Sequence, residues 1–317
     1  MIECYRTENG ALLEAPEEQA SVWLCMAPDA AEQTRLCECL AVGAQVLESS
    51  LDPDEVARIE IKPEHLFLIW KRPESFDGRV FNVSSFGVVL SERRLVVICS
   101  SNSLLAGIDR QTGMSTPLDV LMALLAESVH HYLGHLRVVK QVAREIQLQF
   151  DRTMDNQHLV QMYSLSESLV YYVNAIQSNG AVLALLRSHG QKHGFGPAQL
   201  EALNDLNIEN EQSYQQAKIH AQVFTNLIEA RGNLANNGMN HALRNLTLIN
   251  VVFLPLNLLA SIGGMSEFSM MTADMSWWLS FPALLLGMTV LGGAMAVALR
   301  RMTRPATAQE KFYTTRE

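Results

Sequence analysis

Polar side chains recur at helical spacing in an otherwise apolar segment near the C-terminus. Residues three or four apart share one face of a helix. One such face would carry Asn240, Leu243, Thr247, Asn250, Leu254, Asn257 and Ser261. Carboxamide and hydroxyl groups in apolar surroundings cost free energy unless they are hydrogen-bonded or face water. This line of residues could border a water-filled lumen, or it could join neighbouring helices by hydrogen bonds, and the pattern leaves both interpretations open.

A second candidate set lies upstream, on another predicted helix. Glu127, His131 and His135 are spaced four residues apart. Histidines at positions i and i+4 are a spacing that metal sites use, so the set is a candidate metal site. A solvated helix face gives the same pattern, and we prefer that simpler interpretation.

The sequence carries no pattern of an enzyme or a nucleic-acid-binding protein. It has no nucleotide-binding glycine loop, no nucleophile elbow and no supported pair of catalytic carboxylates, and we expect no covalently bound cofactor. A net charge of −9 disfavours binding to phosphate backbones. The five cysteines are scattered, which favours reduced thiols in a cytosolic domain over a disulfide framework.

Two segments have the length and composition of membrane-spanning helices. Residues 246–265 and 277–299 contain no charged side chain. About 20 apolar residues cross a hydrocarbon core about 30 Å thick. We therefore predict a two-helix hairpin in a lipid bilayer, with an outer loop at residues 266–276 and a basic tail at residues 300–317.

The distribution of charge predicts the orientation of this hairpin. The loop contains Glu267 and Asp274 but no Lys or Arg, whereas the tail contains Arg300 and Arg301. Positive residues stay on the cytoplasmic side, so we expect both termini in the cytoplasm and the loop outside. The two loop carboxylates would attract cations in general and discriminate little among them.

The chain before the hairpin divides by its periodicity. Residues 1–115 mix apolar strand patterns with a helical pattern at 28–47, which predicts a cytoplasmic α/β domain. Strands are expected at 65–70, 82–90 and 94–99. Residues 116–197 predict a helical part, and residues 198–245 a long stalk helix that leads into the first span.

The order of these parts resembles the CorA family of metal-ion transporters, which includes the ZntB zinc transporters. The local resemblance is strongest at Met239-Asn240, Phe253-Leu254-Pro255-Leu256 and Gly263-Gly264-Met265-Ser266. The resemblance implies a funnel-shaped homo-oligomer, a pentamer, in a bacterial inner membrane. It also implies Mg²⁺, Zn²⁺, Co²⁺ or Ni²⁺ as transported or regulatory ligands.

The resemblance assigns roles to residues of the first span. It places Asn240, Leu243, Leu246, Leu254, Asn257 and Ser261 on the lumen, and the stripe found from helical spacing adds Thr247 and Asn250 as pore-lining candidates. The three leucines would form a hydrophobic constriction that gates by dewetting. Gly264, Met265 and Ser266 would form the pore entrance.

The entrance departs from the family signature, which is Gly-Met-Asn. Here Ser266 stands where the family has Asn, and a hydroxyl is shorter and offers fewer hydrogen bonds than a carboxamide. The departure is typical of divergent members such as the CmaX type. The leading hypothesis is a divalent cation channel or transporter with altered selectivity. The alternative is a weakly conducting or non-conducting membrane protein with a regulatory or scaffolding role.

Overall fold

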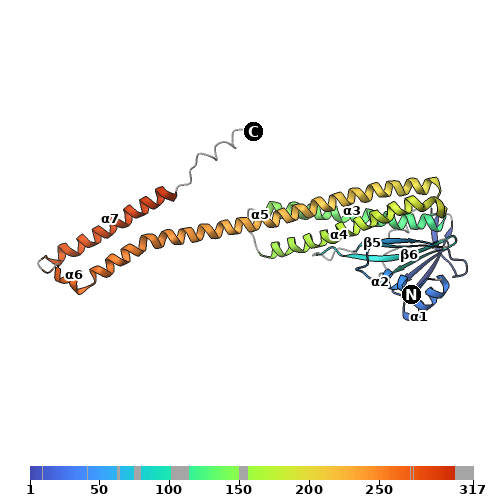
Figure 1. Ribbon diagram of the computed structural model, residues 1–317, viewed down its shortest axis with the longest axis horizontal. Helices are drawn as coiled ribbons and strands as arrows, with labels where there is room; N and C mark the ends of the chain where they lie inside the picture. The colour runs from blue at the N-terminus through green and yellow to red at the C-terminus, as the bar shows by residue number, and fades with distance from the viewer. Residues whose placement is uncertain are drawn as a thin grey trace, which may run out of the picture. The chain divides into compact units, whose positions relative to one another are not determined.

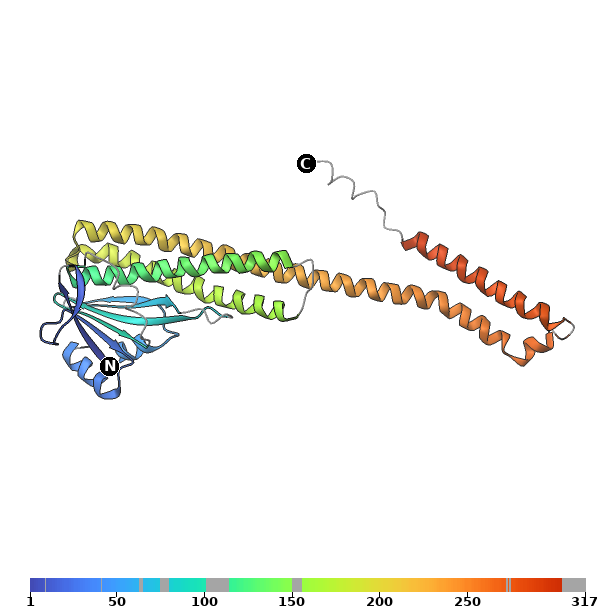
Figure 2. The same ribbon diagram turned by 180° about the vertical axis from the view of Figure 1, so that it is seen from behind.

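The structure is a computed structural model with two compact units. It describes residues 1–8, 10–40, 42–62, 65–74, 80–100, 114–149, 156–271, 273 and 275–303. The first unit is Met1–Glu229 and the second is Ala230–Glu317. Figures 1 and 2 show the elements from opposite sides.

The first unit is built on a seven-stranded sheet in the order β2-β1-β3-β7-β6-β5-β4. Its strands are β1 (Ile2–Glu8), β2 (Ala11–Glu14), β3 (Val22–Met26), β4 (Arg58–Ile61), β5 (His65–Pro73), β6 (Val83–Ser91) and β7 (Leu95–Cys99). The pair β3 and β7 is parallel, and the other neighbours are antiparallel. The three strands expected at 65–70, 82–90 and 94–99 are confirmed as β5, β6 and β7.

Helices cover both faces of this sheet. They are α1 (Ala30–Leu40), α2 (Ala44–Leu51), α3 (Pro117–Gln149), α4 (Asn156–His189) and α5 (Pro197–Gly263), with a short 3₁₀ helix η2 (Gly190–His193) before α5. The single helix expected at 28–47 is wrong. Gly43 precedes α2 in an extended conformation, with φ −71° and ψ 154°, and divides the segment into two helices.

Alternate residues of each central strand pack on opposite faces of the sheet. In β7, Val96 and Ile98 face the layer of α1 and α2, while Leu95 and Val97 face the layer of α3 and α4. Both faces are covered, which explains why the strand sequences are continuously apolar. The described residues of the first unit therefore form three layers, with the sheet in the middle (Figure 1).

Beyond the sheet, α3, α4 and the first part of α5 pack against one another. Tyr132, Tyr172 and Phe224 are fully buried in this helical core. α4 is long and apolar enough to cross a membrane, but 44% of its most apolar stretch is buried inside the protein. Its apolar residues are therefore accounted for by packing within the first unit.

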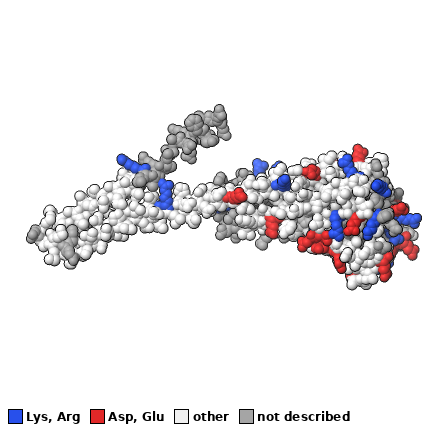
Figure 3. All heavy atoms as spheres, viewed as in Figure 1, with Lys and Arg blue, Asp and Glu red and all other residues white. Residues whose placement is uncertain are grey.

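The second unit consists of the C-terminal part of α5, the short helix α6 (Ser266–Met271) and α7 (Trp277–Thr303). α5 and α7 are both long and apolar enough to cross a membrane. The most apolar stretch of each helix contains no buried residue. Almost no charged side chain appears on these helices in Figure 3. The expected stalk and first span form one continuous helix, and part of the expected outer loop is helical.

Candidate pore helix and ion entrance

The polar stripe lies on α5 and is exposed along its whole length. Its members and the neighbouring Leu246 all have exposed side chains, namely those of Asn240, Leu243, Leu246, Thr247, Asn250, Leu254, Asn257 and Ser261. Leu254, in the middle of the stripe, keeps 69% of its surface exposed. Pro255 lies within the same helix and removes one main-chain donor there.

α7 packs on the other side of α5. The half-buried positions of the α5 span are Leu248, Val252, Pro255, Leu256, Leu259 and Gly263, which follow helical spacing on one face. Two glycines allow the approach. A Cβ at Gly292 would lie 3.2 Å from Cδ1 of Leu256, and a Cβ at Gly263 would lie 2.7 Å from Cδ2 of Leu284. Each residue of the stripe is therefore turned away from α7.

Among the described residues, no hydrogen bond joins the stripe of α5 to α7. The Thr247 hydroxyl donates to the Leu243 carbonyl on its own helix, at 2.9 Å. Within the described part of the chain, the carboxamides of Asn250 and Asn257 have no hydrogen-bond partner. Because such groups need a partner at membrane depth, they require water or another copy of the chain. In the described part of the hairpin, Asn250 and Asn257 therefore do not hydrogen-bond α5 to α7.

The expected entrance residues lie at the turn where α5 ends. The main-chain N–H of Gly264 donates to the Ala260 carbonyl at 3.1 Å, and that of Met265 donates to the Ile262 carbonyl at 3.1 Å. Ser266 is the first residue of α6. Of the two acidic loop residues, Glu267 lies in α6 without a described side chain, and Asp274 lies outside the described residues.

The candidate metal site on α3 is not assembled. Among the described residues, no three His, Cys, Asp or Glu side chains converge as metal ligands. Nδ1 of His135 is instead 2.6 Å from the Tyr172 hydroxyl of α4, and the His131 ring packs edge-on against His135. Burial lowers the pKa of His135 to about 4, with His131 adding to the effect. The structure does not bring Glu127, His131 and His135 together as a three-ligand set, and His135 is hydrogen-bonded to Tyr172 instead.

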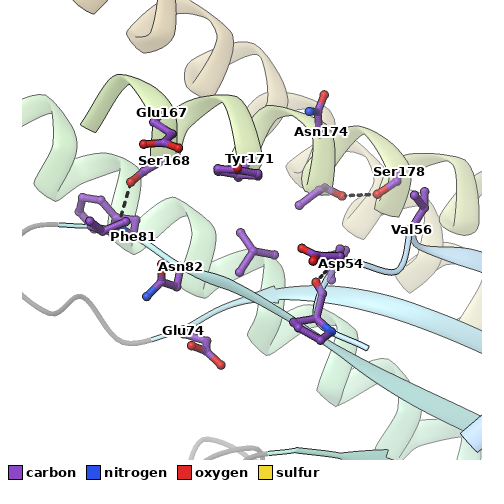
Figure 4. A pocket seen from close by; sticks show the side chains of 15 residues that line it. Asp54, Val56, Glu74, Phe81, Asn82, Glu167, Ser168, Tyr171, Asn174 and Ser178 are labelled. Carbon is purple, nitrogen blue, oxygen red and sulfur yellow. Dashed lines mark hydrogen bonds between the residues drawn. The ribbon is translucent and has the colours of Figure 1, made fainter. Parts of the chain in front are cut away.

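A cavity of about 650 Å³ opens between α4 and the ends of β5 and β6, and we call it the acidic cavity because Asp54, Glu74 and Glu167 line it. Figure 4 shows Glu167 and Tyr171 of α4 facing Glu74 and Asn82 on the strand side. The Lys71 ammonium group donates to the Pro53 carbonyl, and burial lowers the pKa of this lysine. The cavity is bounded by segments that lie far apart in the sequence.

Comparison with known proteins decides the family. The model of the CorA-like Mg²⁺ transporter protein family matches residues 18–301. The chain belongs to the CorA-like Mg²⁺ transporter family. A curated relative, the cobalt/magnesium transport protein CorA of Methanocaldococcus jannaschii, is 22% identical over 266 residues, which are 78% of this chain and 82% of that protein.

Solved structures show that this member of the CorA-like family has the family fold. The complete CorA magnesium transporter of Methanocaldococcus jannaschii matches 96% of this chain and 98% of its own, with a TM-score of 0.77 and 19% identity. The full-length CmaX protein matches 95% of this chain and 97% of its own, with a TM-score of 0.72 and 15% identity. CorA-like proteins are membrane transporters, so the expectation of a non-enzymatic membrane protein is confirmed.

Family membership leaves the roles of individual residues as predictions. The departure at Ser266 is a feature of this CorA-like sequence, and its effect on selectivity is an expectation from side-chain chemistry. Sequence reasoning missed the acidic cavity and the contact between His135 and Tyr172. Both join residues on different elements, and no local spacing signals them.

Proposed function

We propose that this CorA-like protein is a homo-oligomeric channel or transporter for divalent cations in the inner membrane, with both termini in the cytoplasm. The observation that carries the proposal is the exposed stripe of α5, which includes Asn250 and Asn257 and is turned away from α7. A single helix cannot enclose a lumen, so several copies around an axis are needed, and the family resemblance favours five.

The proposed path runs along the stripe from Ser266 to Asn240. At the outer end, the Ser266 hydroxyl and nearby main-chain carbonyls would meet a hydrated ion. Asn257, Ser261 and Asn250 would offer carboxamide and hydroxyl groups to its water shell. Leu243, Leu246 and Leu254 would form a narrow apolar ring that empties of water when the pore is closed.

The nature of the entrance bears on which ion passes. Mg²⁺ gives up its water reluctantly, so an entrance reads its hydration shell. A ring of short hydroxyls at Ser266 would hold that shell more loosely than a ring of carboxamides. We therefore propose weaker preference for Mg²⁺ over Zn²⁺, Co²⁺ and Ni²⁺ than a Gly-Met-Asn entrance would give.

A second candidate function rests on the same substitution. If the Ser266 ring cannot hold a hydrated ion, the CorA-like architecture would conduct little and act as a regulatory or scaffolding membrane protein. This alternative expects a protein partner and no ion flux, whereas the leading proposal expects flux from the purified protein alone.

Cysteine accessibility tests the orientation of α5. Asn257→Cys should react with a small, membrane-impermeant thiol reagent, whereas Leu259→Cys, on the α7 side, should not. The native cysteines all lie between Cys4 and Cys99, so labelling is counted above that of the unchanged protein. Equal labelling at both positions would contradict the proposed lumen.

The mass of the particle tests the assembly. Native mass measurement in a gentle detergent should give a multiple of the 35.3 kDa chain. A strictly monomeric particle that remains folded would contradict a pore built from several copies.

A further inference from the structure

Four methionines crowd the turn between the two span helices. The chain has 14 Met in all, and Met265, Met270, Met271 and Met275 fall within one short stretch. All four side chains are strongly exposed, Met270 at 79% and Met271 at 86%. The proposed pore needs none of them except Met265, which belongs to the entrance motif.

Contact with lipid alone does not explain the choice of methionine. Between Met265 and Ser276 there is no Leu, Ile or Val, so every large aliphatic side chain is a methionine. Leu and Ile would anchor a turn in the membrane surface equally well. What distinguishes Met from them is its polarisable sulfur, which is a weak acceptor and a soft metal ligand.

The four methionines fall within the one turn that joins α5 to α7. Met270 and Met271 are consecutive at the end of α6, and the Met270 carbonyl accepts the N–H of Ala273 at 3.3 Å, which turns the chain back. Met275 follows just before α7, and Met265 just precedes α6. Each methionine has three rotatable side-chain bonds, so its thioether can take many positions around a fixed main chain.

The chemistry of the donors selects the ion. Thioethers prefer soft cations such as Cu(I), whereas Mg²⁺ and other hard ions take oxygen ligands. The turn between Gly264 and Ser276 contains neither Cys nor His. Its only soft donors are therefore thioethers, which do not form disulfides in an oxidising compartment.

We propose that Met265, Met270, Met271 and Met275 form a binding site for a soft monovalent cation, Cu(I) or Ag(I), at the turn between α5 and α7. The proposed function places this site at the outer mouth of the pore, where each copy in an oligomer would contribute four more sulfurs. Binding itself requires neither flux nor a given oligomeric state, so it can fail or succeed independently of the proposed function.

The test compares the wild type with a variant in which all four methionines of the turn are leucine. Leucine conserves volume and apolar character, so it preserves membrane contact and removes only the sulfur. The matched control replaces Met288 and Met295 of α7 by leucine. Circular dichroism and gel filtration of the full chain confirm that both variants fold as the wild type does.

Binding is measured by calorimetric titration with Ag(I) in detergent, after thiol alkylation. Alkylation is needed because Cys4, Cys37 and Cys39 are at least partly exposed and would bind the same ion. We expect the wild type and the α7 control to bind alike, and the four-leucine variant to bind more weakly by about a factor of ten or more. A Mg²⁺ titration should not distinguish the three proteins.

Two results would overturn the proposal. One is Ag(I) binding that is unchanged in the four-leucine variant, because the sulfurs would then serve only as apolar surface. The other is an equal loss in the α7 control, because binding would then be a general property of methionine in this protein. If the four-leucine variant loses Ag(I) binding while the wild type conducts no divalent ion, the site stands and the proposed function falls.

Discussion

Asn179 of α4 is hydrogen-bonded to the main chain of β5, at the edge of the sheet beside the acidic cavity. Its carboxamide oxygen accepts the main-chain N–H of Lys71 at 3.0 Å, and its nitrogen donates to the Lys71 carbonyl at 2.7 Å. β4 pairs with β5 only from Leu66 to Ile69, so Lys71 lies past the end of β4. Asn179 therefore takes the place of the missing strand, and its side chain is 0% exposed.

Replacing Asn179 by Leu keeps the volume but removes both bonds. A buried N–H without a partner costs about 1–3 kcal/mol. Among the described residues, the Lys71 carbonyl would then accept a hydrogen bond only from the Ser128 hydroxyl, at 3.4 Å, a weaker contact that limits the further loss. We expect the free energy of unfolding to fall by about 2–4 kcal/mol.

Urea unfolding of the full chain in detergent measures this change, and hydrogen exchange of the β5 peptide reports on the Lys71 amide directly. Asn174→Leu, on the exposed side of the same helix, is the matched control and should change stability by less than about 0.5 kcal/mol. An Asn179→Leu effect as small as that of the control, with the Lys71 amide still protected, would refute the reasoning.

Two further predictions concern the helical core and the membrane hairpin. The pKa of His135 is about 4 in the folded protein against 6.5 for the free group, so the unfolded state binds the proton first as pH falls through this window. Stability should therefore drop between pH 6.5 and 4, by about 1–2 kcal/mol after allowance for partial exposure, and His135→Gln should flatten the profile in thermal melts. In the hairpin, Gly292→Leu should collide with Leu256 and cost about 1–3 kcal/mol, measured as a lower melting temperature in micelles. Gly293→Leu, where a Cβ meets nothing within 4 Å, should leave the melting temperature unchanged, and equal effects of the two would contradict the assigned packing face.

Much of the fold follows from local pattern, because burial on two faces leaves a distinct trace in sequence. β5 and β7 are continuously apolar since helices cover both faces of the sheet. The break before α2 was harder to predict, because the segment around Gly43 has helix-forming residues on both sides. In the structure Gly43 is extended, and α1 and α2 pack against the sheet as separate helices.

The candidate pore shows where sequence reasoning stops. Periodicity predicts that Asn250 and Asn257 share a face, but only the contacts of Gly263 and Gly292 show that α7 covers the opposite face. The acidic cavity has no sequence signature, since Asp54, Asn82 and Glu167 come from three distant segments. Spacing along one helix also suggested a set of metal ligands on α3. Spacing alone does not show that Tyr172 of α4 is hydrogen-bonded to His135.

Ion flux into liposomes tests the central claim most directly. Uptake of Mg²⁺, Zn²⁺, Co²⁺ and Ni²⁺ is followed with trapped dyes for the wild type, Asn257→Leu, Ser266→Asn and Asn245→Leu. The last variant makes the same chemical change on α5 outside the stripe. The account predicts uptake of at least one ion by the wild type, retention in Asn245→Leu and loss in Asn257→Leu. Undiminished uptake in Asn257→Leu, or no uptake in any variant including Ser266→Asn, would contradict a pore along this face of α5.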